Sequence, residues 1–137
     1  MTRLVADTNV YISALVFGGV PQRVLELTAV EGFSVYVSPS ITGEVEGVLL
    51  KKFSWTPDDL KTFLPPLWQR CISIRPTVRL MVCADPDDNH VLECAQAARA
   101  DFLITGNARH FPKSHRTTTI LSPRQFFEMV RGKAGPP

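Results

Sequence analysis

The sequence predicts an α/β protein with a three-layer α/β/α architecture, in which helices cover both faces of a parallel sheet. Short runs of β-branched residues alternate with helical stretches along the chain, which is typical of βαβ units. The length of 137 residues, with 45% hydrophobic and 20% charged residues, suits one domain with an ordinary apolar core. Acidic residues also recur after predicted strands, where parallel sheets place their ligand sites.

The first predicted strand is followed by two helices. Leu4–Ala6 is a short apolar strand, and Val10–Leu15 has helical character until Gly18–Gly19 interrupts it. Pro21 suits the first position of the next helix, because its fixed φ is already helical. We expect that helix to stop at Gly32.

A second strand, Phe33–Val37, leads into two further helices. Ser38 begins a helix that is expected to run to about Lys52. Its apolar residues recur with helical spacing on one face: Ile41, Val45, Val48 and Leu49. Thr56 is the expected N-cap of the next helix, which Pro65–Pro66 is expected to end or kink.

The rest of the chain predicts three strands and two helices. Cys71–Ile74, Phe102–Thr105 and Thr118–Leu121 are the strands. Asp88 is the expected N-cap of the helix between the first two of them, and Ser122–Val130 is a capped terminal helix. The helix after Asp88 carries an apolar face: Val91, Leu92, Ala95 and Ala98.

Composition excludes several classes of protein. No stretch approaches the roughly 20 apolar residues of a membrane-spanning helix, and the first residues do not form a signal sequence. Three cysteines without a C-x-x-C pair fit reduced thiols. We therefore expect a cytoplasmic protein without a membrane partner, with one domain over residues 1–131 and a flexible tail over 132–137.

The charge is distributed unevenly along the chain. Residues 1–108 contain 9 Lys and Arg against 12 Asp and Glu, whereas residues 109–137 contain 6 against 1. A basic end suits a polyanionic partner, although a solvated charged face is the commoner explanation for any single cluster.

Several acidic residues are expected to meet at one edge of the sheet. Asp7 follows the first strand, Glu44 lies one turn into the helix after the second strand, and residues 85–88 precede the next long helix. Carboxylates that meet at the ends of parallel strands repel one another, and a divalent cation such as Mg²⁺ or Mn²⁺ relieves the repulsion. A cation at such a site activates water, so the pattern predicts metal-dependent hydrolysis of a phosphodiester.

Five segments, in this order, resemble the PIN-domain family of small Rossmann-like ribonucleases, which includes toxins of bacterial toxin-antitoxin pairs. They are Leu4–Val10, Ser38–Val45, Asp85–Asp88, Ile104–Phe111 and Ile120–Pro123. The resemblance covers nearly the whole chain. It implies a PIN-like fold, a Mg²⁺ or Mn²⁺ cofactor, RNA as the substrate, a cognate antitoxin protein and a homodimer.

The resemblance also implies which residues form the site. By position it assigns the catalytic and metal-binding acids as Asp7, Glu44 and Asp88. Asp88 is preferred to its neighbours because it directly precedes the helix, and Asp85 is expected as a peripheral ligand. Asn107 stands where many relatives have Asp, and its amide oxygen is a weak ligand that adds no negative charge. Asn9 and Thr105 are expected beside the metal, where they orient its ligands.

The basic residues that follow the last acidic loop are expected to contact RNA phosphates. They are Arg109, His110, Lys113 and Arg116. A solvated loop is the structural alternative for the same residues.

Other interpretations remain open beside a ribonuclease. A catalytically degenerate PIN-like module that binds RNA or protein without cutting is the main alternative, because Asn107 carries no charge. A phosphotransferase of the haloacid dehalogenase type needs an Asp where this chain has Asn9. His90 and Cys94 could face one metal together with Cys83, but a zinc site normally takes four ligands.

Overall fold

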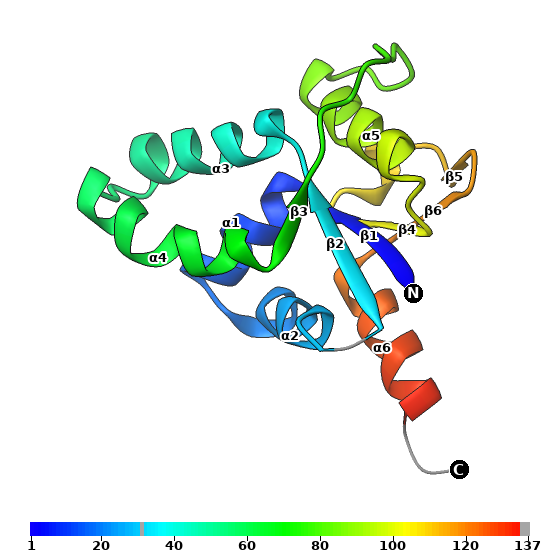
Figure 1. The fold of residues 1–137 in the computed structure, drawn as a ribbon, viewed down its shortest axis with the longest axis horizontal. Coiled ribbons are helices and arrows are strands. Elements are labelled where there is room, and N and C mark those ends of the chain that lie inside the picture. Colours follow the sequence, from blue (N-terminus) through cyan, green and yellow to red (C-terminus); the bar gives the residue numbers. More distant parts are fainter. Residues whose placement is uncertain (31, 135–137) are drawn as a thin grey trace.

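The computed structural model describes residues 1–30 and 32–134, which form one sheet and the helices that pack on it (Figure 1). The sheet has six strands in the order β3-β2-β1-β4-β6-β5, and all neighbours are parallel except β5 and β6. The strands are β1 (Thr2–Ala6), β2 (Phe33–Val37), β3 (Cys71–Ser73), β4 (Phe102–Ile104), β5 (Ser114–His115) and β6 (Thr118–Leu121). The helices are α1 (Thr8–Val16), α2 (Gly19–Thr28), α3 (Pro39–Lys52), α4 (Pro57–Gln69), α5 (Pro86–Ala98) and α6 (Pro123–Ala134), with a 3₁₀ turn, η1 (Ala108–His110).

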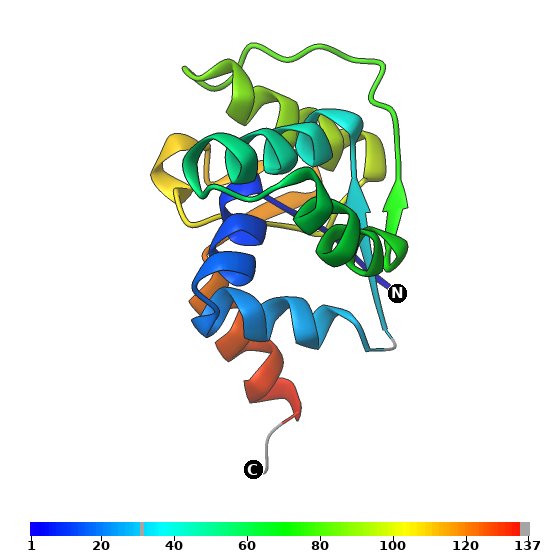
Figure 2. The same ribbon diagram turned by 90° about the vertical axis from the view of Figure 1, so that its left-hand side faces the viewer.

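Helices lie on both faces of the sheet, which confirms the three-layer α/β/α prediction. Helix α5 packs on β1, β2 and β4, whereas α2 and α6 pack together on the other side (Figures 1 and 2). Helices α3 and α4 extend alongside α1. Trp68 of α4 packs edge-on against Tyr11 of α1, with ring centroids 5.1 Å apart, so this partly buried tryptophan packs against the core.

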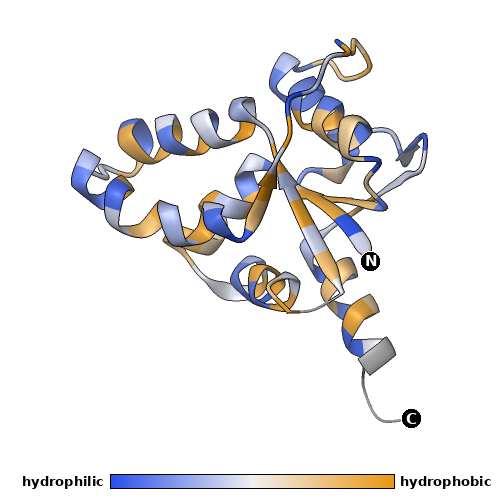
Figure 3. Ribbon diagram, in the orientation of Figure 1, coloured by the Kyte–Doolittle hydropathy of each residue, from blue (hydrophilic) through white to orange (hydrophobic). Residues whose placement is uncertain are grey.

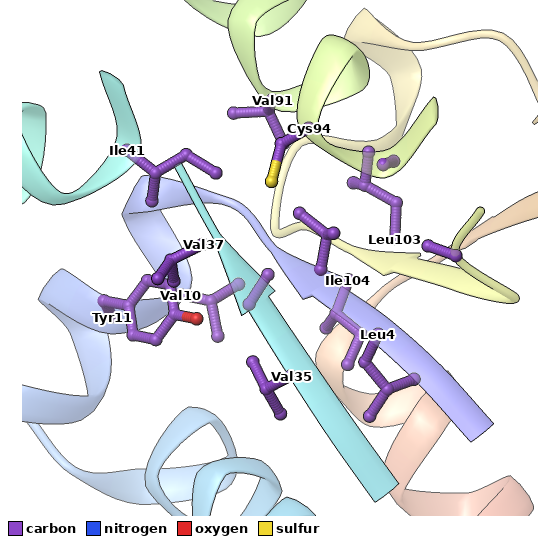
Figure 4. Close-up of a cluster of buried hydrophobic side chains, with 14 of the residues drawn as sticks. Leu4, Val10, Tyr11, Val35, Val37, Ile41, Val91, Cys94, Leu103 and Ile104 are labelled. Carbon is purple, nitrogen blue, oxygen red and sulfur yellow. The ribbon is translucent and has the colours of Figure 1, made fainter. Parts of the chain in front are cut away.

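Strand β1 lies at the centre of the sheet, and it is buried on both faces. Leu4, Val5 and Ala6 are each at most 3% exposed. A continuous apolar run of this kind is typical of a parallel strand with helices on both sides. Figure 4 shows Leu4 among side chains of β2, β4 and the helices, and Figure 3 shows the hydrophobic colour concentrated on the central strands.

Strand β1 has a parallel neighbour on each side, and this arrangement positions the site. Leu4 pairs with Val35 of β2 on one side and with Phe102 of β4 on the other. The carboxyl ends of β1 and β4 therefore form a topological switch point, where open α/β sheets bind ligands. The amide of Asp7 donates to the carbonyl of Ile104 at 2.8 Å, which holds the two strand ends side by side.

The N-caps at three helices are those that the sequence predicts. The Ser38 hydroxyl accepts from the amide of Ile41. Thr56 and Asp59 cap each other's amides at 3.1 and 2.8 Å, and Ser122 and Gln125 do the same at 3.0 and 2.9 Å. Each exchange satisfies two backbone donors that a helix start leaves free.

The prediction that Asp88 caps α5 is wrong. The N-cap is Asp85, whose Oδ1 accepts from the amide of Asp87 at 2.9 Å. Asp88 lies in the first turn of the helix, so its carboxylate is free for another role.

Two proline positions also differ from the prediction. Helix α2 begins at Gly19 rather than at Pro21, because Gly18 adopts φ 77° as its N-cap. Helix α4 continues through Pro65–Pro66 to Gln69. Both prolines are exposed, as are Lys61 and Thr62 four residues earlier, so water can solvate the carbonyls that lose their hydrogen bonds.

The C-terminal helix is longer than the sequence predicts. Helix α6 extends to Ala134, past the expected end at Val130, so residues 132–134 of the expected tail are helical. Residues 135–137 lie outside the described residues.

Asp101 has a structural role, because its Oδ2 accepts from the amide of Arg3 at 2.8 Å at the far end of β1. None of the described helices has the length and apolar character needed to cross a membrane.

Candidate active site

Asp7 is the buried acid at the end of β1. It is only 4% exposed, and its Oδ2 accepts a hydrogen bond of 2.8 Å from the Thr105 hydroxyl. Burial raises the pKa of Asp7, whereas Thr105, the nearby amides of Thr8 and Asn9, and the charge of His110 lower it. Neither amide completes a capping bond to the side chain, so its second oxygen remains available to a ligand.

Glu44 lies in α3 and faces the same site. Partial burial raises the pKa of Glu44, and the charges of Asp87 and Asp7 raise it further. The Thr8 hydroxyl lies toward Glu44 and lowers this pKa, although its oxygen is buried without a formal hydrogen-bond partner among the described residues. Glu44 therefore belongs to the electrostatic neighbourhood of Asp7.

Asp88 completes this neighbourhood from the first turn of α5. Partial burial raises the pKa of Asp88, the charges of Asp7 and Asp85 add to the effect, and the charge of His110 opposes it. Nδ1 of His110 lies 3.8 Å from Oδ2 of Asp88. The structure thus brings Asp7, Glu44 and Asp88 together from three different elements.

The chemistry of these groups fits a hard divalent cation. All three offer carboxylate oxygens, and Asp7 raises the pKa of both Glu44 and Asp88, so added positive charge would relieve the repulsion. As the side chains stand, no three Asp, Glu, His or Cys groups within residues 1–30 and 32–134 surround one point at ligand distance.

Asp85 and Asn107 lie at the periphery. The Oδ1 atom of Asp85 is occupied by the amide of Asp87, although its charge still acts on Asp88 and Glu44. The amide of Asn107 donates to the Thr105 hydroxyl at 3.0 Å. Asn107 and Asn9 line a cavity of about 430 Å³ beside the acids. Asn9 approaches Asp7 through its backbone, and its side chain is exposed.

The predicted basic residues divide into two groups. His110 contacts Asp88, whereas Arg109, Lys113 and Arg116 are exposed on η1 and around β5. The other cations of the basic C-terminal region lie on α6, which runs away from α5 (Figures 1 and 2). Of that region, His110 contacts an acid, whereas Arg116 lies at the opposite end of the sheet. Arg116 belongs to the turn between β5 and β6, where the hydroxyls of Thr117 and Thr118 donate to the carbonyl of Ala100 just before β4.

The zinc alternative receives no support. His90 pairs with Glu93 at 3.2 Å, and Cys94 is fully buried. Burial raises the pKa of the Cys94 thiol to about 12, which disfavours the thiolate that zinc binds.

A comparison with known families agrees with this arrangement. The family model for the PIN domain matches residues 3–109, which include every acid described above. The chain belongs to the PIN-domain family. This PIN domain is 33% identical over 110 residues to an uncharacterized protein of Methanocaldococcus jannaschii, which covers 77% of this chain and 70% of that protein.

A solved structure shares the fold of this PIN domain. It is the crystal structure of VapBC2 from Rickettsia felis bound to a DNA fragment from their promoter. The match has a TM-score of 0.61 and 19% identity, and it covers 88% of this chain and 98% of that chain. At this identity the match establishes the architecture.

Two residues of the site are not singled out by the sequence. Thr8 follows Asp7 directly and lies toward Glu44, and Asp87 acts on Glu44 from α5. The only sequence evidence is their position within the segments that hold Asp7 and Asp88. Their influence on Glu44 depends on how α3 packs against α1 and α5, which local patterns do not specify.

Proposed function

We propose that this PIN domain is a metal-dependent endoribonuclease that hydrolyses phosphodiester bonds of RNA. Asp7, Glu44 and Asp88 are the proposed metal ligands, with Asp85 and Asn107 in peripheral positions. The observation that carries the proposal is electrostatic: Asp7, buried at the end of β1, raises the pKa of the partly buried Glu44 in α3 and Asp88 in α5, at the switch point of the sheet.

Each part of the chain has a role in this proposal. When bound, Mg²⁺ or Mn²⁺ supplies a Lewis acid that polarises the phosphodiester and activates water. Thr105 holds Asp7 in place through its 2.8 Å hydrogen bond. We propose that His110, which lies beside Asp88, and the exposed Arg109 and Lys113 bind the phosphates next to the scissile bond, and that Arg116, at the other end of the sheet, binds a phosphate farther along the strand.

We also propose that the protein is the toxin of a toxin-antitoxin pair, is blocked by a cognate antitoxin and forms a homodimer. Support comes from the family and from the fold shared with the Rickettsia felis VapBC2 structure. Co-purification with the product of a neighbouring small reading frame tests the antitoxin, and light scattering tests the dimer. A lone monomer under all conditions contradicts the dimer.

A cleavage assay with matched variants tests the nuclease. Fluorescent single-stranded RNA is incubated with Mg²⁺, Mn²⁺ or EDTA and with wild type, Asp7→Asn, Glu44→Gln or the control Glu46→Gln. Glu46 lies in the same helix as Glu44, two residues away. We expect EDTA and Asp7→Asn to lower the rate to about 1% or less, because both remove the charge balance of the site, and Glu46→Gln to retain the rate.

A melting assay in parallel reports metal binding without cleavage. Mn²⁺ should raise the melting temperature of wild type, since a ligand that binds only the folded state stabilises it. Asp7→Asn should abolish that rise. Cleavage that persists in EDTA or in Asp7→Asn contradicts the proposal. RNA binding without cleavage under any metal would favour the binding-only module, which the neutral Asn107 keeps open.

A further inference from the structure

A cavity of about 430 Å³ opens directly beside the acids, and the proposed reaction does not use it. It shares Asn9 and Asn107 with the edge of the candidate active site, and it continues along α1 to the end of α3. Its size falls within the range of small-molecule sites, about 300–1,000 Å³.

The cavity differs from the acidic site in charge. Among the described residues that line it there is no Asp or Glu, and Lys52 is the one charged side chain. The amides of Asn9 and Asn107 and the hydroxyl of Ser13 supply uncharged donors and acceptors. Such a wall accepts a polar, aromatic group with a phosphate attached more readily than a cation.

Two phenylalanines, Phe17 and Phe53, line the cavity. Phe17, at the end of α1, is 74% exposed, and its ring lies 5.9 Å from that of Phe53, at an interplanar angle of 81°. A T-shaped pair leaves the faces of one ring free of its partner, and the exposure of Phe17 leaves it open to solvent. Exposed aromatic faces beside a nucleic-acid site are where unpaired bases stack.

We propose that this cavity is a nucleobase subsite, which seats the base of a nucleotide next to the scissile phosphate. Phe17 stacks on the base, the amides of Asn9 and Asn107 contact its edge, and Lys52 contacts the next phosphate. Bases of a double helix are not available for such insertion, so the subsite takes an unpaired base. This inference rests on the proposed nuclease function and adds a site that holds one base.

The composition of the cavity wall decides between a nucleotide and a protein segment. Beside its apolar residues the wall carries two amides, a hydroxyl and a lysine, which suit a base edge and a phosphate, and it meets the candidate active site at Asn9 and Asn107. These features favour a nucleotide strand over a protein segment.

An abasic scan tests the subsite in the Asp7→Asn background, which prevents cleavage. Fluorescence anisotropy measures binding of a single-stranded RNA oligonucleotide and of copies with one abasic position each. The variants are Phe17→Leu, Phe17→Trp and the control Phe63→Leu. Phe63 is also an exposed phenylalanine, at 55%, but it lines a different cavity.

We expect one abasic position, and Phe17→Leu, each to weaken binding by about tenfold. The two changes together should be no worse than either alone, because they remove the same contact. Phe17→Trp should retain binding and Phe63→Leu should leave it unchanged. A free nucleoside monophosphate could also fill the cavity. If it binds saturably while no abasic position weakens binding of the oligonucleotide, the proposal that the cavity holds a base of an RNA strand is overturned.

Two further outcomes separate this inference from the proposed function. If wild type cleaves single-stranded RNA and Phe17→Leu binds RNA as tightly as the parent protein, the base subsite is overturned and the nuclease proposal stands. If Phe17→Leu loses self-association while its RNA binding is unchanged, Phe17 belongs to a protein contact and the base subsite is again overturned. Absence of cleavage under any metal, with the abasic effect present, contradicts the nuclease and leaves the base subsite standing.

Discussion

The hydroxyl of Thr105 donates a 2.8 Å hydrogen bond to Asp7, although the two residues are 98 positions apart in the chain. Thr105 is fully buried, and its oxygen also accepts from the amide of Asn107. One hydroxyl therefore ties the acid at the end of β1 to the loop that follows β4. No water can take over this role, since the side chain has no exposed surface.

Replacing Thr105 by Val should destabilise the protein and weaken its activity. The change keeps the shape but leaves an oxygen of Asp7 and the amide of Asn107 without a partner, at a cost of about 1–3 kcal/mol. Urea unfolding measures the loss, and the RNA cleavage assay measures the activity. Thr105→Ser keeps the hydroxyl and should lose less of both; equal effects of Val and Ser would contradict the role of the hydrogen bond.

Glu44→Gln should become more stabilising, relative to wild type, as the pH rises. The pKa of Glu44 is raised in the folded state above its ordinary value of 4.5, so folding favours its protonated form. This contribution is fully present below pH 4.5 and is lost as the pH rises through the folded pKa, whereas a glutamine does not titrate. In urea unfolding with EDTA from pH 4 to 7, the free energy of unfolding of Glu44→Gln should rise increasingly relative to that of wild type.

Glu46→Gln is the control for this pH series. It removes a carboxylate from the same helix, so a pH dependence seen in Glu44→Gln alone belongs to the position of Glu44 and not to the loss of any carboxylate from α3. A flat Glu44→Gln difference would mean that Glu44 does not share the field of Asp7 and Asp87.

Asn89→Ala should loosen the segment that precedes α5. The Asn89 oxygen accepts from the amides of Val82 and Cys83 at 3.0 and 2.7 Å, and its nitrogen donates to the carbonyl of Cys83 at 3.0 Å. We expect a loss of about 1–3 kcal/mol, because these partly buried groups lose their partners. Limited proteolysis should show faster cutting between residues 76 and 84. Asn89→Asp keeps the acceptor and should lose less; cutting unchanged in both variants would contradict the anchor.

Arg99→Gly should stabilise the protein by about 1 kcal/mol. Arg99 ends α5 in the left-handed conformation, with φ 51° and ψ 49°, which costs any side chain about 1–2 kcal/mol relative to glycine. Arg70 ends α4 with φ −83°, so Arg70→Gly should give no gain. Chemical unfolding compares the two, and equal effects would show that the strain at Arg99 is already relieved.

The sequence predicts the fold well where local chemistry decides it. The caps at Ser38 and Thr56 and the strand Phe33–Val37 lie where they are expected. Residues 85–88 contain three aspartates, so the N-cap is ambiguous from sequence and is set by the backbone conformation of Asp85. Strand β5 has only two residues, and its turn uses a positive φ at Arg116 instead of a glycine, so no pattern indicates it.

The candidate site is predictable to a similar extent. Strand ends point to Asp7 and to the loop of Asn107, because parallel strands share one ligand edge. Two other relations depend on packing between elements far apart in the chain. They are the contact of His110 with Asp88 and the place of Asn9 in the wall of a cavity. Such relations follow from the tertiary structure and leave no local pattern.

The central position of β1 has a consequence for translation. Its neighbour β4 is made roughly a hundred residues later, so Asp7 leaves the ribosome long before Thr105 exists to hold it. The nascent chain carries its carboxylates dispersed and hydrated for most of its synthesis. A prematurely terminated product that lacks Thr105 also lacks the hydrogen bond that holds Asp7 in the candidate site. The candidate site can therefore form only in a chain that is nearly complete.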